Sequence, residues 1–269
     1  MRDRPDLSSL LNPGRIAVIG ASNSEFKVGG IVLRRLGRSR RRLYPVNPKE
    51  SVIQGHKVFP DVPSLPDGID LAVITLSAPL AVRAVEACIE KQIPNCIVVA
   101  GGFGETGGQG MVLEERLKTL ARQNRVNILG PNSLGIFLPN EEIDTIFVEH
   151  GDRALARDGS IACIVQSGSI GTEALGYAAN TGFGMRAFVG LGNKCDLDEN
   201  DFLMHFGRDP KTRCLGFYLE NIADGRTFLR NARRVSRQKP VVILKAGMSH
   251  TAAAAVASHT GKLAGSDKV

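Results

Sequence analysis

Short apolar segments alternate with longer helical stretches along most of the chain, and this alternation limits the fold more than any other feature. Strands and helices at this spacing predict βαβ units around parallel sheets that are buried on both faces. The predicted strands are Arg15–Gly20, Arg42–Val46, Leu71–Leu76, Cys96–Ala100, Asn127–Leu129, Ile161–Gln166, Arg186–Gly190, Cys214–Glu220 and Pro240–Ala246. The predicted helices are Gly30–Leu36, Leu80–Lys91, Met111–Gln123, Ser169–Asn180, Glu199–Phe206 and Gly225–Ser236.

The apolar rhythm stops over residues 140–158, where acidic and polar side chains predominate. We place a domain boundary there. The sequence therefore predicts an α/β protein with two doubly wound units, residues 1–145 and 150–269. A length of 269 residues is compatible with two medium domains.

Composition argues against several classes of protein. Trp is absent and aromatic residues make up only 5% of the chain, which disfavours a surface that stacks nucleic-acid bases. No apolar run approaches the ~18 residues of a membrane-spanning helix, and the N-terminal MRDRPDLSS is too polar for a signal peptide. The five cysteines are scattered without a CxxC pair, as in reduced proteins of the cytosol. We expect a soluble cytoplasmic protein that binds neither nucleic acid nor membranes.

Positive charge is concentrated in one segment. The formal net charge is +7, and six arginines fall in nine positions: Arg34, Arg35, Arg38, Arg40, Arg41 and Arg42. Such a run indicates either a polyanionic partner or ligand with several phosphates, or a solvated helix end. The sequence leaves both open.

The loop after the first strand is rich in glycine. In open parallel sheets, ligands bind beyond the carboxyl ends of the strands. GASNSEFKVGG, which starts at Gly20, offers free backbone N–H groups and room for a phosphate. It lacks the G-x-G-x-x-G spacing, although this loop alone does not exclude NAD. A merely structural turn is the alternative.

Asn47 and Lys49 follow the second strand, where an NAD-dependent dehydrogenase would have Asp or Glu. The change favours a ligand with phosphate on its ribose, as in NADP and coenzyme A. A turn fixed by Pro48 is the alternative. Further turns at Ser77–Pro79, 101–108 and 130–135 complete a rim of glycines and small polar residues along the same edge.

The second half repeats the passage from strand through glycine to helix at Ser167, Gly168 and Ser169. The N-terminus of the following helix would bind an anion. Gln166 occupies the place of the first glycine of a nucleophile elbow, which disfavours a serine hydrolase.

A histidine lies in a small-residue loop after the last strand. His259 in ASHTGKLAG could attack a phosphoryl group if one ring nitrogen is free and the other is held by an acceptor. His250, in a similar setting, is the competing candidate. No cluster of side chains has the spacing of a metal site.

Eight motifs occur in order along the chain: GAS…KVGG, YPVNPK, GPNSLGIF, VQSGSIG, GNKCDLDENDFL, YLENIADGRTFL, KPVVILKAG and SHTGKLAG. Together they resemble the ADP-forming acetyl-CoA synthetases, relatives of the α subunit of succinyl-CoA synthetase, over essentially the whole chain. The resemblance implies a CoA-binding Rossmann-like domain followed by a flavodoxin-like ligase domain. It also implies interconversion of a small carboxylic acid, CoA and a nucleoside triphosphate with acyl-CoA, nucleoside diphosphate and phosphate, through an acyl phosphate and a phosphohistidine.

The resemblance assigns roles residue by residue. His259 matches the phosphorylated histidine and Glu220 the glutamate that orients its ring. The phosphoryl group would be held by Ser167, Gly168, Ser169 and Gly261. The CoA nucleotide would be bound by Gly20, Ser22, Lys27, Val28, Asn47 and Lys49, and the pantetheine and thiol end by Ser77, Pro79 and Asn132.

The sequence departs from the family pattern at several points. Ser133 stands where Cys is common, and Asn221 stands where Gly is common. The helical stretch before the histidine loop is MSHTAAAAVA, which is less polar than usual. The chain ends at Val269 without an ATP-grasp module, so ATP, ADP and Mg²⁺ would bind through a partner subunit or a further domain, in a homo- or hetero-oligomer.

Two alternatives remain beside the synthetase. A CoA-sensing regulatory module of a protein acetyltransferase would use the same folds with an idle histidine. An NADP-dependent reductase conflicts with the missing G-x-G-x-x-G.

Overall fold

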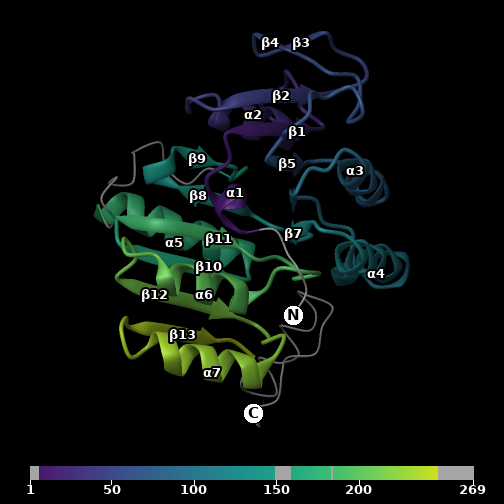
Figure 1. Cartoon of the computed structure of the whole chain (residues 1–269). Helices are drawn as coiled ribbons and strands as arrows, with labels where there is room; N and C mark the ends of the chain where they lie inside the picture. Colours follow the sequence, from purple (N-terminus) through teal and green to yellow (C-terminus); the bar gives the residue numbers. More distant parts are fainter. Residues whose placement is uncertain (1–5, 149–158, 183, 248–269) are drawn as a thin grey trace.

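The structure is a computed structural model that describes residues 6–148, 159–182 and 184–247. Two large sheets are each accompanied by helices, and the first is built from the N-terminal half of the chain and the second mostly from the C-terminal half (Figure 1). The strands of the first sheet are β1 (Arg15–Ile19), β2 (Arg42–Val46), β5 (Leu71–Ile74), β6 (Asn95–Val98) and β7 (Asn127–Leu129). All pair in parallel, in the order β2-β1-β5-β6-β7.

The second sheet has the order β13-β12-β10-β11-β8-β9. Its strands are β8 (Gly135–Leu138), β9 (Ile143–Asp144), β10 (Ile161–Val165), β11 (Met185–Gly190), β12 (Cys214–Leu219) and β13 (Val241–Lys245). The four strands β10 to β13 are parallel, whereas β8 is antiparallel to β11 and to β9. A separate two-stranded hairpin comprises β3 (Val52–Ile53) and β4 (His56–Lys57).

The helices are α1 (Ser8–Leu11), α2 (Val28–Leu36), α3 (Ala78–Glu90), α4 (Gly108–Gln123), α5 (Gly168–Thr181), α6 (Glu199–Arg208) and α7 (Gly225–Val235), with short 3₁₀ turns η1 (Gly104–Thr106) and η2 (Pro139–Glu141). Apolar residues of α3 and α4 pack on one face of the first sheet. A second hydrophobic cluster joins α2 to β8 and β9 and to the side of the second sheet that α6 and α7 cover. Residues of α5 pack on the other side of that sheet.

The predicted strands and helices are confirmed, with ends shifted by a few residues. The strands β8 and β9 were not predicted. They lie before residue 145 yet pair with the second sheet. Gly135–Leu138 follows the 130–135 turn too closely to stand out as a strand, and its pairing partner Phe188 is distant in sequence. Long-range pairing of this kind leaves no local pattern.

The arginine run has a structural role that neither sequence-based interpretation included. The side chain of Arg35 is 5% exposed, and its Nη1 lies 3.2 Å from Oδ2 of Asp144 in β9. Its Nη2 donates to the carbonyl oxygen of Val148 at 3.0 Å. Arg41 donates to the carbonyl oxygen of Glu141 at 2.8 Å. These two arginines therefore connect α2 and the loop before β2 to the segment around β9, which belongs to the second sheet.

An extended segment after β11 docks on the edge of the first sheet. The N–H groups of Asn193, Cys195 and Leu197 donate to the carbonyl oxygens of Pro131, Gly130 and Ile128, at 2.8, 2.9 and 3.1 Å. The N–H of Ile128 donates in return to Oδ2 of Asp196 at 3.0 Å. We call residues 193–198 the linking segment, because it belongs to the second unit but hydrogen-bonds to the first.

The linking segment ends at the N-cap of α6. Oδ1 of Asp198 accepts from the N–H of Asn200 at 2.7 Å, and Asp201 accepts from the N–H of Asp198 at 3.0 Å, which forms a capping box. Burial, followed by the neighbouring carboxylates Glu199 and Asp201, raises the pKa of Asp198 to about 6.

We expect Arg35→Met to lower the free energy of unfolding by about 3 kcal/mol, because it removes the cation beside the largely buried Asp144 carboxylate. Urea denaturation with linear extrapolation measures the change. The matched control is the adjacent Arg34→Met. Arg34 is 41% exposed and lies 3.9 Å from Glu25, so its loss should change stability by less than ~0.5 kcal/mol. Equal effects of the two variants would contradict the structural role of Arg35.

Asp198→Asn should stabilise the protein at pH 8 by about 2–3 kcal/mol. The folded state holds the Asp198 proton more tightly than the unfolded chain, because the folded pKa is about 6 against 3.8. The loss of folding stability caused by ionisation of Asp198 is therefore absent below about pH 4 and complete above about pH 6. Asparagine keeps an oxygen that can accept from Asn200. Thermal unfolding of both forms at a series of pH values measures the difference.

The control for this experiment is Asp224→Asn at the N-cap of α7. There the hydrogen bonds from Thr227 lower the pKa of the Asp224 carboxyl, so its charge favours the folded state. The stability difference from wild type at pH 8 should have the opposite sign in this variant. The same sign in both variants would refute the assignment for Asp198.

Candidate functional site

A pocket of about 400 Å³ opens beyond the carboxyl ends of β1, β2 and β5. The strand order reverses between β1 and β5, and this topological switch point is where doubly wound sheets bind ligands. The pocket is lined by Ile19, Gly20, Ala21, Ser22, Lys27, Val46, Asn47, Pro48, Pro60, Asp61, Val62, Pro63, Leu76, Leu80, Arg83, Ala84 and Ala87. We call it the nucleotide pocket.

Two glycines are sterically required beside this pocket. Gly20 has a φ of +92°, and a Cβ there would lie 2.7 Å from Oγ1 of Thr75. A Cβ on Gly29, in the first turn of α2, would lie 2.0 Å from the carbonyl oxygen of Gly20. The helix thus starts in direct contact with the end of β1. This close approach brings its N-terminus to the pocket wall, where it could face an anionic group.

Asn47 fixes the loops around the nucleotide pocket. Its Nδ2 donates to the carbonyl oxygen of Ala21 at 2.8 Å, and its Oδ1 accepts from the N–H of Lys49 at 2.8 Å. Gln54 braces the same loop by donating to the carbonyl oxygens of Ser22 and Gly30, at 3.2 and 2.9 Å. The amide of Asn47 therefore links the loop after β1 to the turn after β2.

Four of the predicted cofactor-binding residues line the nucleotide pocket: Gly20, Ser22, Lys27 and Asn47. Five others do not. Val28 begins α2, Lys49 is exposed on the surface, Ser77 and Pro79 stand exposed at the start of α3, and Asn132 lines the other pocket described below. Sequence reasoning missed Arg83. Its signal was its place three residues after Leu80, on the face of α3 that lines the pocket.

A smaller pocket of about 160 Å³ lies between the two units. Its described lining residues are Asn132, Ser133, Leu134, Phe147, Gln166, Gly168, Ser169, Gly192 and Asn193. Asn132 follows the last strand of the first sheet, whereas Gly168 and Ser169 begin α5 after β10. Asn132, one of the three residues predicted at the pantetheine and thiol end, thus shares one cavity with the predicted phosphate-binding residues Gly168 and Ser169. We call this cavity the junction pocket.

The N-terminus of α5 is bordered by hydroxyl groups. Ser167 is the N-cap residue and is 5% exposed, and its Oγ lies 3.1 Å from Oγ of Ser169. Unpaired N–H groups and the helix dipole make the first turn of such a helix attractive to an anion. Gly168 has open space where a Cβ would stand, so a ligand could approach the backbone there.

Glu220 lies directly after β12, and the switch point of the second sheet falls between β10 and β12. Its side chain is only 3% exposed. Gln166 accepts the N–H groups of Glu220 and Asn221 at its Oε1, at 3.0 and 3.3 Å. Burial, and after it the Glu220 charge, raises the pKa of Tyr218. The residues that follow β12 are therefore hydrogen-bonded to Gln166, which directly precedes Ser167.

Ser133 and Asn221, the two departures from the family pattern, both make hydrogen bonds. The Ser133 hydroxyl donates to the carbonyl oxygen of Gly190 at 2.6 Å and accepts the N–H of Gly135 at 3.0 Å. Oδ1 of Asn221 accepts from Nε2 of Gln166 at 3.4 Å. The Ser133 hydroxyl thus connects the loop after β7 of the first sheet to the end of β11 in the second sheet. His250, His259 and Gly261 lie outside the described residues, so their predicted roles remain predictions.

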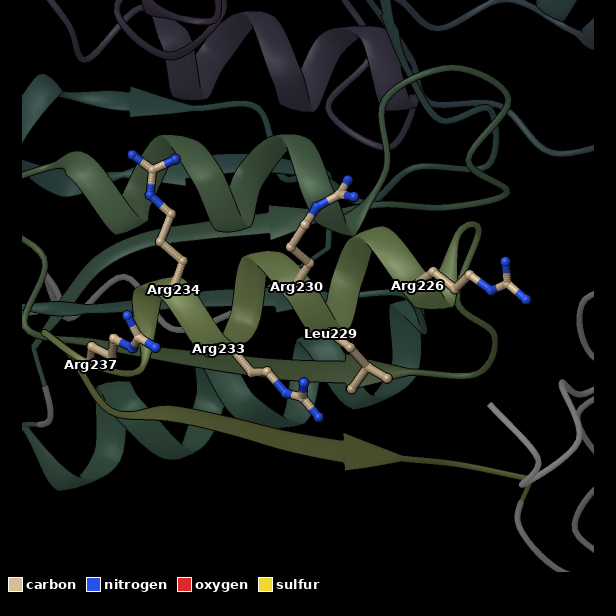
Figure 2. Close-up of a pocket in the computed structure, with 6 residues that line it drawn as sticks. All are labelled: Arg226, Leu229, Arg230, Arg233, Arg234 and Arg237. Atoms are coloured by element: carbon tan, nitrogen blue, oxygen red, sulfur yellow. The ribbon is translucent and has the colours of Figure 1, made fainter.

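A third hollow, of about 470 Å³, has all of its described lining residues in α7 and the turn after it (Figure 2). These are Arg226, Leu229, Arg230, Arg233, Arg234 and Arg237. Because these residues come from one helix and its end, the hollow lies between surface side chains and is not a cleft at strand ends.

Within the part of the chain that the structure describes, no helix is long and apolar enough to cross a membrane. Among the same residues, no group of three or more His, Cys, Asp or Glu side chains could hold a metal ion.

Comparison with known proteins identifies both units. Residues 14–139 match the model of the CoA binding domain, and residues 158–269 match the model of the succinyl-CoA ligase like flavodoxin domain. The predicted α/β fold class, a Rossmann-like domain followed by a flavodoxin-like one, is thereby confirmed.

Similar proteins match along almost the whole chain. Acetate–CoA ligase [ADP-forming] I of Archaeoglobus fulgidus is 39% identical over 97% of this chain and 37% of that protein. The α subunit of acetate–CoA ligase [ADP-forming] I of Pyrococcus furiosus is 38% identical over 98% of this chain and 57% of that subunit. The chain thus spans about a third to just over half of the length of these relatives.

A solved structure agrees with the sequence comparisons. It is dinucleotide forming acetyl-coenzyme A synthetase 1 of Candidatus Korarchaeum cryptofilum, in complex with phosphate and ADP, which superposes with a TM-score of 0.89 at 36% identity, over 97% of this chain and 56% of that one. With two successive domain matches and relatives of this identity, the chain belongs to the ADP-forming acyl-CoA synthetases, as the α-side part that joins a CoA-binding domain to a succinyl-CoA-ligase-like flavodoxin domain.

Proposed function

We propose that this chain is the CoA-binding and phosphohistidine-carrying part of an NDP-forming acyl-CoA synthetase. The observation that carries the proposal is the junction pocket, where Asn132 from the CoA-binding unit meets Gly168 and Ser169 at the N-terminus of α5. A synthetase needs the thiol of CoA and a phosphoryl-binding turn in one enclosed place, because the acyl group moves from phosphate to sulfur.

The nucleotide pocket suits the phosphate-bearing end of CoA. Lys27 and Arg83 are two cations on its wall, and α2 starts beside it. Phosphate oxygens would accept charge-assisted hydrogen bonds from these side chains. The pantetheine would pass the start of α3, at Ser77 and Pro79, and bring the thiol to Asn132. A volume of about 160 Å³ in the junction pocket favours a short carboxylic acid.

In the direction of acyl-CoA synthesis, a ring nitrogen of His259 attacks the γ-phosphorus of ATP and ADP leaves. The phosphoryl group then passes to an oxygen of the carboxylic acid, which forms the acyl phosphate and restores the imidazole. The sulfur of CoA attacks the acyl carbonyl and expels inorganic phosphate, which takes up the thiol proton. Glu220 would hold the proton on the other ring nitrogen, and Ser167, Ser169 and Gly261 would hold the phosphoryl oxygens.

ATP, ADP and Mg²⁺ would bind on an ATP-grasp subunit or domain; the match to an α subunit of Pyrococcus furiosus supports a partner subunit. We place the assembled enzyme in the cytoplasm. The alternative is a CoA-sensing module with an idle histidine. It gives no role to the buried carboxylate of Glu220. The junction pocket and the ligase relatives favour the synthetase.

The first test is labelling by ³²P-acetyl phosphate or, with the nucleotide-binding partner, by γ-³²P-ATP. We expect an acid-labile, base-stable phosphate on the wild-type protein, because phosphohistidine has this stability. His259→Ala should abolish the label and leave CoA affinity unchanged. Loss of the label in His250→Ala, with retention in His259→Ala, would assign the reaction to the other ring.

The second test measures CoA binding by calorimetry. Lys27→Ala and Arg83→Ala should each weaken binding by roughly 1–2 kcal/mol, the range of a charge-assisted contact. Lys211→Ala, an exposed lysine of the second unit, is the matched control and should not change the affinity. CoA affinity that is unaltered in both pocket variants would reject the nucleotide pocket as the CoA site.

A further inference from the structure

We propose that the linking segment is a positioning device, in which Lys194 fixes the Glu220 turn of the second unit and Asn193 fixes the thiol-end loop of the first. The inference rests on the proposed function and goes beyond it. It assigns positioning roles to Lys194, Glu199 and Asn193, of which only Asn193 lines the junction pocket.

Lys194 forms an ion pair that is almost fully removed from water. Its Nζ lies 2.9 Å from Oε2 of Glu199, and the two side chains are 3% and 0% exposed. Taking two charges out of water has a desolvation cost that the ion pair repays only with good geometry and further hydrogen bonds. Lys194 also adopts a φ of +57°, which is uncommon for a residue with a side chain. The buried charge and the positive φ of Lys194 both oppose folding, which indicates that this residue serves a purpose other than stability.

The ion pair holds the turn that follows Glu220 from both ends. Nζ of Lys194 donates to the carbonyl oxygen of Asn221 at 2.8 Å. Oε1 of Glu199 accepts from the N–H of Ala223 at 2.6 Å. The same pair of side chains thus binds one carbonyl and one amide of a three-residue turn, so the turn cannot shift without separating two buried charges.

Glu220 itself is fixed by its backbone. Its N–H donates to Gln166, and its carbonyl oxygen accepts from Nζ of Lys245 at 2.9 Å. Gln166 stands next to Ser167, so the same hydrogen bonds set the backbone of Glu220 relative to the proposed phosphate-binding turn. A catalytic constellation has to be held to within a fraction of an ångström by such supporting groups.

Asn193, the neighbour of Lys194, reaches in the opposite direction. Its Nδ2 donates to Glu105 and, at 2.8 Å, to Oε2 of Glu114, both in the first unit. Its Oδ1 lies 3.5 Å from Nδ2 of Asn132. Burial opposes ionisation of Glu105, but hydrogen bonds from Asn193 and the loop N–H groups outweigh it and lower its pKa, so the carboxylate is charged at neutral pH.

Consecutive residues of one segment are therefore tied to the two halves of the proposed reaction centre. Asn193 is tied to the loop of Asn132, and Lys194 to the turn of Glu220. The main chain between them is hydrogen-bonded to the edge of the first sheet. The distance between the thiol end of CoA and the histidine-orienting carboxylate is set by this segment.

The test uses the double variant Lys194→Met/Glu199→Gln, which removes both charges and leaves no buried ion without its partner. With ³²P-acetyl phosphate as the phosphoryl donor and without CoA, we expect the rate constant of histidine labelling to fall at least tenfold in this variant. The acetyl phosphate concentration at half-maximal rate and the dissociation constant of CoA should change less than twofold. A purely structural pair would instead lower the melting temperature and leave the labelling rate intact.

The matched control is Arg35→Met/Asp144→Asn, which removes another largely buried ion pair, 3.2 Å long, whose two residues do not line the junction pocket. It should label at the wild-type rate. Hydrogen exchange supplies a readout that does not depend on labelling: peptides covering residues 218–225 should exchange at least fivefold faster in the Lys194→Met/Glu199→Gln variant, and those covering residues 15–20 should not.

The outcomes separate the two proposals. If the wild-type protein takes no label, the phosphohistidine function fails and the positioning role fails with it. If the wild type is labelled and the Lys194→Met/Glu199→Gln variant is labelled at the same rate, only the positioning role is overturned. Should that variant not fold, Asn193→Ser serves in its place, with the same threshold for the labelling rate and with exchange measured over residues 100–108.

Discussion

The docking of the linking segment along the edge of β7 is the contact on which the geometry of the site depends. Each sheet has its own switch point, and two separate sheets could be arranged in many ways. Three backbone hydrogen bonds and one to Asp196 fix the end of β11 against the end of β7. The carboxyl edges of both sheets are thereby brought together, and the junction pocket lies where they meet.

Electrostatic contacts support this arrangement at a distance from the pocket. Arg35 and Arg41 connect the first sheet to the stretch around β9, and Arg186 in β11 lies 2.7 Å from Glu141 and 2.8 Å from Asp209. Planar guanidinium groups suit such places, because each can bind two acceptors at once. Part of the positive charge in this chain therefore holds the two units together and is not available to an external polyanion.

The sequence was sufficient for the parts of the molecule that have a local pattern. Apolar runs predicted nearly every strand of the parallel sheets, and the loops after them predicted Gly20, Lys27, Asn47 and Ser169 as pocket residues. It was insufficient wherever a role depends on a distant partner. Lys194 and Asn193 lie in a motif that was recognised as a family feature, yet their contacts with Asn221 and Glu114 follow only from the docking of the segment. Arg83 and Gln54 were missed for the same reason.

Two groups proposed to act with His259 lie at the carboxyl edge of the second sheet. The described chain leaves β13 beside β12, at the edge where Glu220 stands, and Lys245 contacts the Glu220 carbonyl there. His259 follows Gly247 by twelve positions, and a fully extended chain of that length spans about 40 Å. Chain length alone therefore does not fix the place of phosphoryl transfer, which we assign to groups of the described chain. Glu220 and the first turn of α5 are two such groups, and Gln166 connects the backbone of Glu220 to the residues that begin α5, because its Oε1 accepts the Glu220 N–H at 3.0 Å.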